Sequence, residues 1–131
     1  FYIETGERRI FIEVKGVTLE EDGVVMFPDA PTERGVKHLN ALARSVGDGY
    51  DAHVAFVVQM SGVRYFTPNN RTHPEFGAAL AAAKAAGVRV AAFDCDVTPD
   101  SLAIGRPVAI KDLGLVLIGT VDETVCRHIL R

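Results

Sequence analysis

Apolar and polar residues alternate in short runs along the first part of the chain, a pattern that is typical of β-strands. Four runs have this character: Phe1–Ile3, Ile10–Lys15, Val17–Leu19 and Val24–Phe27. The turn-like stretch Thr5–Arg8 joins the first two runs and favours an antiparallel hairpin. The polar stretch Glu20–Gly23 separates the last two runs and predicts another turn. The chain is therefore expected to open with strands and turns.

After these strands, two segments show the features of helices. A first helix is expected to begin after Thr32, whose side chain suits an N-cap, with Glu33 in the first turn, and to end at Gly47. Its core-facing residues recur at helical spacing: Val36, Leu39, Ala43 and Val46. A second helix is expected over residues 74–86, because the segment opens with a proline, continues with alanine-rich turns and is followed by Gly87.

Apolar runs between and after the helices predict further strands. Ala52–Met60 is almost continuously apolar, as expected of a central strand buried on both faces. Arg64–Phe66 adds a short extended segment, and Val88–Phe93 is the strand after the second helix. The order of hairpin, helix, strand, helix and strand indicates the α/β class, with a mixed sheet and helices on both faces.

The composition is that of a soluble protein with a hydrophobic core. The chain has 131 residues, enough for one domain, of which 48% are hydrophobic and 24% charged. No apolar run approaches the roughly 18–20 residues needed to cross a bilayer, and no stretch reads as a signal peptide. The two cysteines, Cys95 and Cys126, are too few for a disulfide scaffold, so a cytoplasmic protein is expected. Cys95 is predicted to be a small core residue rather than a nucleophile. The chain begins at Phe1, inside an apolar stretch, and is expected to be part of a longer protein.

The first candidate for chemistry is the pair Glu13 and Lys15 on the second strand of the hairpin. Because side chains alternate faces along a strand, both point the same way. In metal-assisted cleavage of a phosphodiester, Glu13 with a second carboxylate would hold Mg²⁺. Lys15 would orient or help to deprotonate the attacking water, or stabilise the charge that develops on the phosphate. The same pair also occurs as a solvated ion pair on ordinary strands, so spacing alone leaves both interpretations open.

The second carboxylate has two candidates near the start of the first helix. Asp29 or Glu33 would serve as a metal ligand if the start of the helix folds over Glu13. Both residue types are also common at helix N-termini for reasons of capping alone, and this alternative stays open.

The first helix carries a polar face that is independent of the strand pair. Its members recur at three- and four-residue spacing: Arg34, Lys37, His38, Ala41, Arg44 and Ser45. We interpret Arg34, Lys37, His38 and Arg44 as residues that bind a nucleic-acid phosphate backbone. The alternative is the solvated side of an amphipathic helix. The net charge of −3 excludes a wholly basic coat for nucleic acid, although a local basic stripe is compatible with it.

Three stretches carry a more specific signal: Phe11–Leu19, Phe27–Gly35 and Lys37–Leu39. They resemble the sugar fermentation stimulation protein family, whose pattern reads approximately Ile-Glu-Val-Lys-x-Val-Thr-Leu and then Phe-Pro-Asp-Ala-x-Thr-Glu-Arg-Gly-x-Lys-His-Leu. The resemblance covers residues 1–110 and implies the carboxy-terminal, nuclease-like domain of such a protein. Residues 111–131 form a tail outside the pattern, in which 113–118 are typical of a strand and 123–130 of a short helix.

The resemblance implies a restriction-endonuclease-like core of the PD-(D/E)xK type. That core has an Asp on one hairpin strand and Glu-x-Lys on the next, which implies that Glu13 and Lys15 are catalytic, with Mg²⁺ as cofactor. The family is described as binding DNA without marked sequence preference and is linked to regulation of sugar, particularly maltose, metabolism. DNA is therefore the expected partner.

One part of the family pattern falls outside the chain. The family's Asp lies in a Ser-Arg-hydrophobic-Asp-Phe stretch whose Phe aligns with Phe1, so the Asp is expected immediately before this chain begins, and neither Glu4 nor Glu7 matches it. Enzymatic activity is therefore left open. Three functions remain as alternatives: a DNA-binding domain without sequence preference, a Mg²⁺-dependent nuclease, and an α/β interaction module that binds no nucleic acid, which the net charge of −3 favours.

Overall fold

The two N-terminal strands form the predicted hairpin. In the computed structural model, which describes residues 1–111, β1 (Tyr2–Thr5) pairs antiparallel with β2 (Arg8–Val17). The two-residue turn between them contains Gly6 at a φ of +59°, a left-handed conformation that glycine adopts without strain. The hairpin therefore forms where the apolar alternation and the turn residues predict it.

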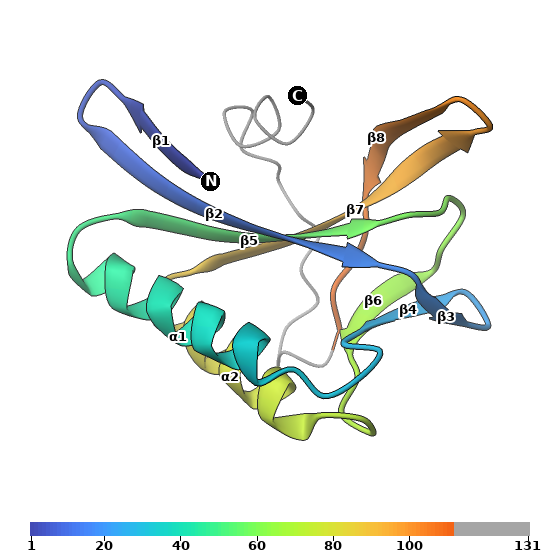
Figure 1. Cartoon of the computed structure of the whole chain (residues 1–131), viewed down its shortest axis with the longest axis horizontal. Helices are drawn as coiled ribbons and strands as arrows, with labels where there is room; N and C mark the ends of the chain where they lie inside the picture. Colours follow the sequence, from blue (N-terminus) through green and yellow to red (C-terminus); the bar gives the residue numbers. More distant parts are fainter. Residues whose placement is uncertain (112–131) are drawn as a thin grey trace.

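The hairpin is one edge of a five-stranded sheet with the order β1-β2-β5-β7-β8 (Figure 1). Its centre is β5 (Asp51–Val58), which pairs in parallel with β2 on one side and with β7 (Arg89–Thr98) on the other. Every residue of β5 after Asp51 is buried. The prediction of a central strand buried on both faces is thus confirmed.

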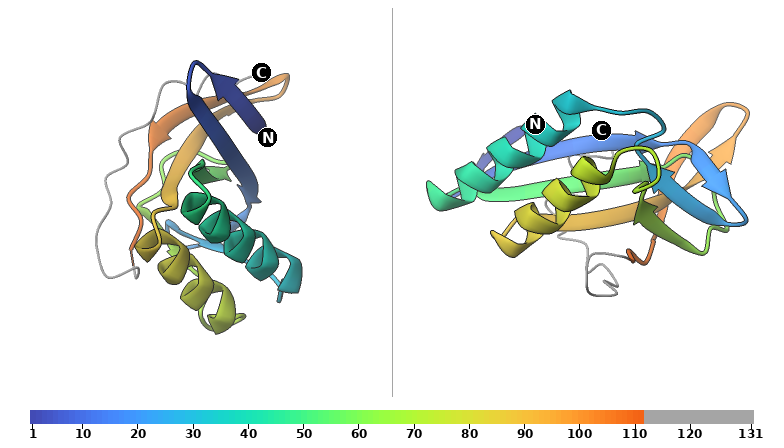
Figure 2. Two further views of the ribbon diagram at one scale, coloured as in Figure 1. Left: turned by 90° about the vertical axis from the view of Figure 1, so that its left-hand side faces the viewer. Right: turned by 90° about the horizontal axis from the view of Figure 1, so that it is seen from below.

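Two helices cover one face of this sheet. α1 (Glu33–Gly47) begins at the predicted N-cap, where the Thr32 hydroxyl accepts a hydrogen bond from the Gly35 amide at 3.0 Å, and α2 (Pro74–Ala85) begins at its proline. The mixed α/β class is confirmed, but the helices lie side by side on the same face rather than on both (Figure 2). The connections from β2 to β5 and from β5 to β7 join parallel strands and advance in one direction across the sheet. Because such crossovers share one hand, both helices fall on the same side.

The remaining strands form a second, smaller sheet. β3 (Leu19–Glu21) pairs antiparallel with β4 (Val24–Phe27), and β4 pairs in parallel with β6 (Tyr65–Pro68). These strands were predicted as extended segments, but their separation from the main sheet is a property of the tertiary structure. The loop from β4 into α1 starts at this second sheet (Figure 1).

The sequence prediction ends the last strand too early. β7 continues beyond Phe93 to Thr98 and pairs antiparallel with β8 (Ser101–Pro107). The outer part of this hairpin is exposed and carries Asp94 and Asp96, so no alternation of buried apolar residues marks it. Cys95 is buried, as predicted. Burial raises the pKa of its thiol, and the neighbouring aspartates raise it further.

The core lies between the sheet and the helices. The Phe56 ring on β5 stacks on the Phe66 ring at a centroid distance of 4.3 Å, and Phe27 and Phe76 complete an aromatic cluster around it. On the opposite face of the hairpin, a separate cluster contains the alternate β2 residues and one from β1: Ile3, Ile10, Ile12 and Val14. Glu13 and Lys15 alternate with these residues along β2, so they point to the face of the sheet that carries the helices.

Replacing Gly35 with Ala is expected to lower the free energy of unfolding by about 1–3 kcal/mol. A Cβ at Gly35 would lie 2.9 Å from the Thr32 methyl carbon and 3.2 Å from the Phe76 ring, so the cap and the contact between the helices must shift. Gly47→Ala is the matched control, because it meets no atom within 4 Å and gains helix propensity. Urea unfolding followed by circular dichroism measures both variants. Equal stability of the two variants would contradict the account of this contact.

No helix within residues 1–111 has the length and the apolar character that a membrane span requires. The predicted strand at residues 113–118 and the predicted helix at 123–130 lie outside the described residues.

Candidate functional site

Three polar side chains meet where the first half of helix α1 lies beside strand β2. The Glu13 carboxylate oxygen Oε1 lies 3.3 Å from Lys15 Nζ and 3.1 Å from His38 Nδ1. Lys15 Nζ lies 3.2 Å from the same His38 nitrogen. The alternation of β2 places Glu13 and Lys15 on one face, and the crossover into α1 places His38 above them. We refer to these three residues as the Glu13 cluster.

His38 has two hydrogen-bonding arrangements within this cluster. When its ring is neutral with the proton on Nε2, Nδ1 accepts a hydrogen bond from the Lys15 ammonium. When Nδ1 carries a proton, it donates to the Glu13 carboxylate. The position of one proton therefore decides which partner His38 holds, while Glu13 and Lys15 stay within ion-pair distance of each other.

The cluster is partly covered and remains open to solvent. The side chain of Lys15 is 14% exposed, whereas those of Glu13 and His38 are each 31% exposed. A largely buried ammonium attracts an anion more strongly than a fully solvated one, because less water screens it. The open side of the cluster therefore presents an ammonium and a carboxylate side by side, and a phosphate that binds at Lys15 competes with Glu13 for its charge.

A pocket of about 430 Å³ adjoins the cluster between β2 and the outer turns of α1. Its lining combines two members of the cluster with apolar and polar residues: Phe11, Glu13, His38, Ala41, Leu42, Arg44, Ser45, Asp48 and Tyr50. The predicted DNA-contacting residue Arg44 thus lies on the wall of the same pocket as Glu13.

The other predicted site residues are more dispersed. Asp29 is exposed on the loop between β4 and α1 and does not belong to the Glu13 cluster. Arg34 and Lys37 are exposed on α1. Arg34, Lys37 and Arg44 form no ion pair or hydrogen bond with another residue of the described part of the chain. Their charges are therefore available to a partner.

The described residues supply one carboxylate at the cluster and do not by themselves fit a Mg²⁺ ion. Within residues 1–111, no group of three or more His, Cys, Asp or Glu side chains is arranged to hold a metal.

The hairpin register shows which position of a longer chain would lie opposite Glu13. Phe1 and Ile12 exchange two backbone hydrogen bonds of 2.8 Å, so a residue before Phe1 in a longer chain would pair with Glu13 and share its face.

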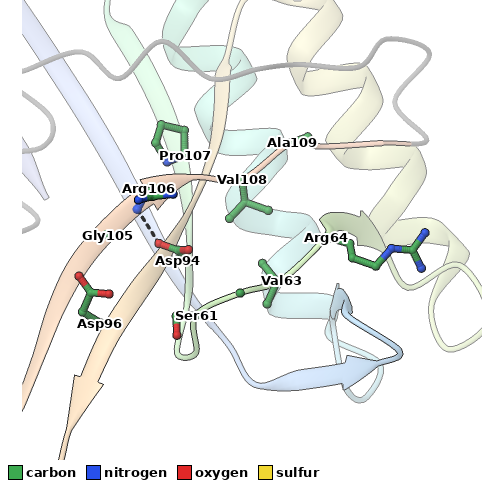
Figure 3. A pocket seen from close by; sticks show the side chains of 11 residues that line it. Ser61, Val63, Arg64, Asp94, Asp96, Gly105, Arg106, Pro107, Val108 and Ala109 are labelled. Atoms are coloured by element: carbon green, nitrogen blue, oxygen red, sulfur yellow. Dashed lines mark hydrogen bonds between the residues drawn. The ribbon is translucent and has the colours of Figure 1, made fainter.

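A second pocket, of about 390 Å³, lies between the β5–β6 loop and the β7–β8 hairpin (Figure 3). Asp94 accepts a hydrogen bond from the backbone amide of Arg106 there, so its carboxylate has a structural partner. Asp96 and Arg64 lie on the rim. This pocket shares no residue with the pocket beside Glu13, and its basic residues provide controls for the site on α1.

Sequence reasoning assigned His38 only to the phosphate-binding helix face and missed its contact with Glu13 and Lys15. The missing signal is tertiary: the connection from β2 through α1 to β5 returns the helix over the sheet and brings His38 onto Glu13 and Lys15. Tyr50, which closes the pocket next to Phe11, was missed because nothing local distinguishes it.

A curled mixed sheet with two helices on one face is a nuclease-like fold, and it places this protein among the restriction-endonuclease-like domains. Residues 1–101 match the family described as the sugar fermentation stimulation protein RE domain. The chain therefore belongs to the sugar fermentation stimulation protein family, as the resemblance predicted.

Related proteins agree with this assignment. The chain is 58% identical over 111 residues to a sugar fermentation stimulation protein homolog of Desulfitobacterium hafniense strain Y51, covering 85% of this chain and 49% of the relative. It is 59% identical over 104 residues to a homolog from Clostridium beijerinckii, covering 79% of this chain and 46% of the relative. The chain thus spans about half the length of these curated relatives.

Among solved structures, the chain is similar to Pyrococcus furiosus SfsA in complex with Ca²⁺. The TM-score is 0.78 at 27% sequence identity, and the match covers 85% of this chain and 48% of that chain.

Proposed function

We propose that this chain is a DNA-binding domain without sequence preference that contacts the phosphate backbone. We further propose that it acts in the cytoplasm, in the regulation of sugar, particularly maltose, metabolism, as the family resemblance implies. The observation that carries the proposal is a row of exposed basic side chains on α1, formed by Arg34, Lys37 and Arg44, beside the Glu13 cluster.

Two physical features support phosphate binding at this surface. The three cations of α1 have no ion-pair partner within residues 1–111, so a phosphate does not have to displace an existing salt bridge. The three basic side chains are distributed along the length of α1. The phosphates of a DNA strand also follow one another at regular intervals, so one helix face can contact several of them. A net charge of −3 does not oppose this, because phosphate contacts depend on the local field rather than on the total charge.

The double substitution Arg34→Ala with Lys37→Ala is expected to weaken binding of a 20-base-pair duplex roughly tenfold at low salt. A matched control, Arg64→Ala with Arg106→Ala, removes the same charge at the pocket of Figure 3 and is expected to change the affinity much less. Fluorescence anisotropy with two duplexes of unrelated sequence measures both effects. Different affinities for the two duplexes, or equal losses in both double variants, would contradict the proposal.

A Mg²⁺-dependent nuclease is the second candidate, and the proximity of Glu13, Lys15 and His38 favours it. The Ca²⁺ complex of the Pyrococcus furiosus relative supports a divalent-cation site in the family. Cleavage by this chain requires a second carboxylate at the cluster. The hairpin register supports the position before Phe1 as the source of that carboxylate, because a residue there would share a face with Glu13.

A further inference from the structure

We propose that the pocket beside the Glu13 cluster receives one unpaired nucleobase of the strand whose phosphate lies at Lys15 and His38. This inference rests on the proposed binding of DNA and adds a substrate class: single-stranded DNA, or a strand end that has frayed from its partner. We refer to this pocket as the base pocket, with the lining residues given above.

The volume of the pocket, and the residues that it shares with the Glu13 cluster, favour a nucleotide as the occupant. The pocket holds about 430 Å³, which lies in the range of sites for small organic ligands. Glu13 and His38 belong both to its wall and to the cluster with Lys15. Because a base and its phosphate are joined through a single sugar, a phosphate held at Lys15 brings its base to the opening of this pocket.

Two aromatic residues that pack against each other, Phe11 and Tyr50, form part of the pocket lining. Phe11 on β2 and Tyr50, just before β5, lie with their ring centroids 4.8 Å apart, and the Tyr2 ring meets Phe11 edge-on at 4.9 Å. The Arg9 guanidinium lies 4.1 Å from the centre of the Tyr50 ring, which adds positive charge behind the aromatic wall. Aromatic walls with nearby cations are the usual means of binding unpaired bases without reading their sequence.

The polar residues on the rim suit the rest of the nucleotide. Arg44 is exposed and has no ion-pair partner within the described residues, so it is available to the next phosphate along the strand. Asp48 provides a carboxylate that can accept a hydrogen bond from an N–H group on a base edge, including N3–H of thymine. The Ser45 hydroxyl donates to the Leu42 carbonyl at 2.7 Å and forms a fixed part of the wall.

A base in an intact duplex cannot enter this pocket. It is paired and stacked between its neighbours, and its removal from the duplex is unfavourable, whereas a base in an unpaired strand is already free of pairing. The surface of α1 is therefore expected to hold phosphates of any DNA, whereas the base pocket adds affinity only for strands with an unpaired base.

The test compares three fluorescein-labelled probes by anisotropy at fixed salt: a 12-nucleotide oligothymidylate, a 12-nucleotide strand with abasic sites throughout, and a 12-base-pair duplex. The chain is expected to bind oligothymidylate about 5- to 30-fold more tightly than the abasic strand, since both carry the same phosphates and stacking is the difference. Tyr50→Phe is expected to keep this ratio, and Tyr50→Ala is expected to bring it close to one.

Ala41→Leu provides a second variant that leaves the core intact. Ala41 is exposed on α1 and lines the pocket, so a leucine there fills the space without removing a core side chain, and the ratio is expected to fall. Equal, salt-dependent binding of oligothymidylate and the abasic strand by the unsubstituted chain would overturn the base pocket and leave DNA binding standing. Absence of binding to all three probes would overturn both proposals.

Discussion

Extending the chain by one Asp before Phe1 is expected to strengthen Mn²⁺ and Mg²⁺ binding at least about tenfold. Phe1 pairs with Ile12 through two backbone hydrogen bonds, so the added residue continues β1 and lies opposite Glu13. Directly paired residues in an antiparallel sheet have Cβ atoms about 4.5–5.5 Å apart on one face. Two carboxylates at that separation hold a divalent cation, whereas Glu13 alone is paired with Lys15 and His38.

Isothermal titration calorimetry with each metal measures this effect, and an added Asn is the matched control. Glu13→Gln in the Asp-extended chain is expected to return the affinity to that of the original chain. If the Asp- and Asn-extended chains bind Mn²⁺ equally well, the register does not place a ligand at Glu13. The nuclease interpretation of this surface would then lose its structural support.

Replacing Phe56 with Ala is expected to lower the free energy of unfolding by about 3–5 kcal/mol, a large share of the stability of a domain of this size. Phe56 is completely buried on the central strand, its ring stacks on Phe66, and Phe27 and Phe76 pack around it. The strand is paired on both sides and buried along its length, so the space left by the ring is expected to stay largely unfilled.

Phe56→Leu is the matched control. It is expected to lower the free energy of unfolding much less than Phe56→Ala, because leucine leaves most of the volume filled. Urea unfolding at 25 °C measures both variants. A loss below about 1 kcal/mol for Phe56→Ala would mean that the aromatic cluster is not the centre of the core.

Local patterns were sufficient to predict the elements that bury a regular set of apolar residues. The run at β5, the spacing of Val36 and Leu39 on α1, and the proline that opens α2 all report burial or helix capping directly. The β7–β8 hairpin escaped prediction because its outer half is exposed and its strand contains two aspartates. A strand that buries little leaves no signal in the order of its residues.

The candidate site divides in the same way. Glu13 and Lys15 are two residues apart, so the alternation of a strand is enough to put them on one face. His38 reaches them from a helix 23 residues further on, and Tyr50 meets Phe11 across an even longer separation. These residues come together only through the crossover connection between parallel strands. The path of that connection follows the general handedness of such crossovers and is not marked by any local motif.

The salt dependence of DNA binding tests the central claim most directly, because displacement of counterions from phosphate is its physical basis. The logarithm of the affinity of the unsubstituted chain for a 20-base-pair duplex is expected to fall linearly with the logarithm of the salt concentration. Arg34→Ala with Lys37→Ala is expected to reduce that slope by about two, since each lost phosphate contact contributes about one. A slope near zero, or a slope that the double substitution leaves unchanged, would contradict the account.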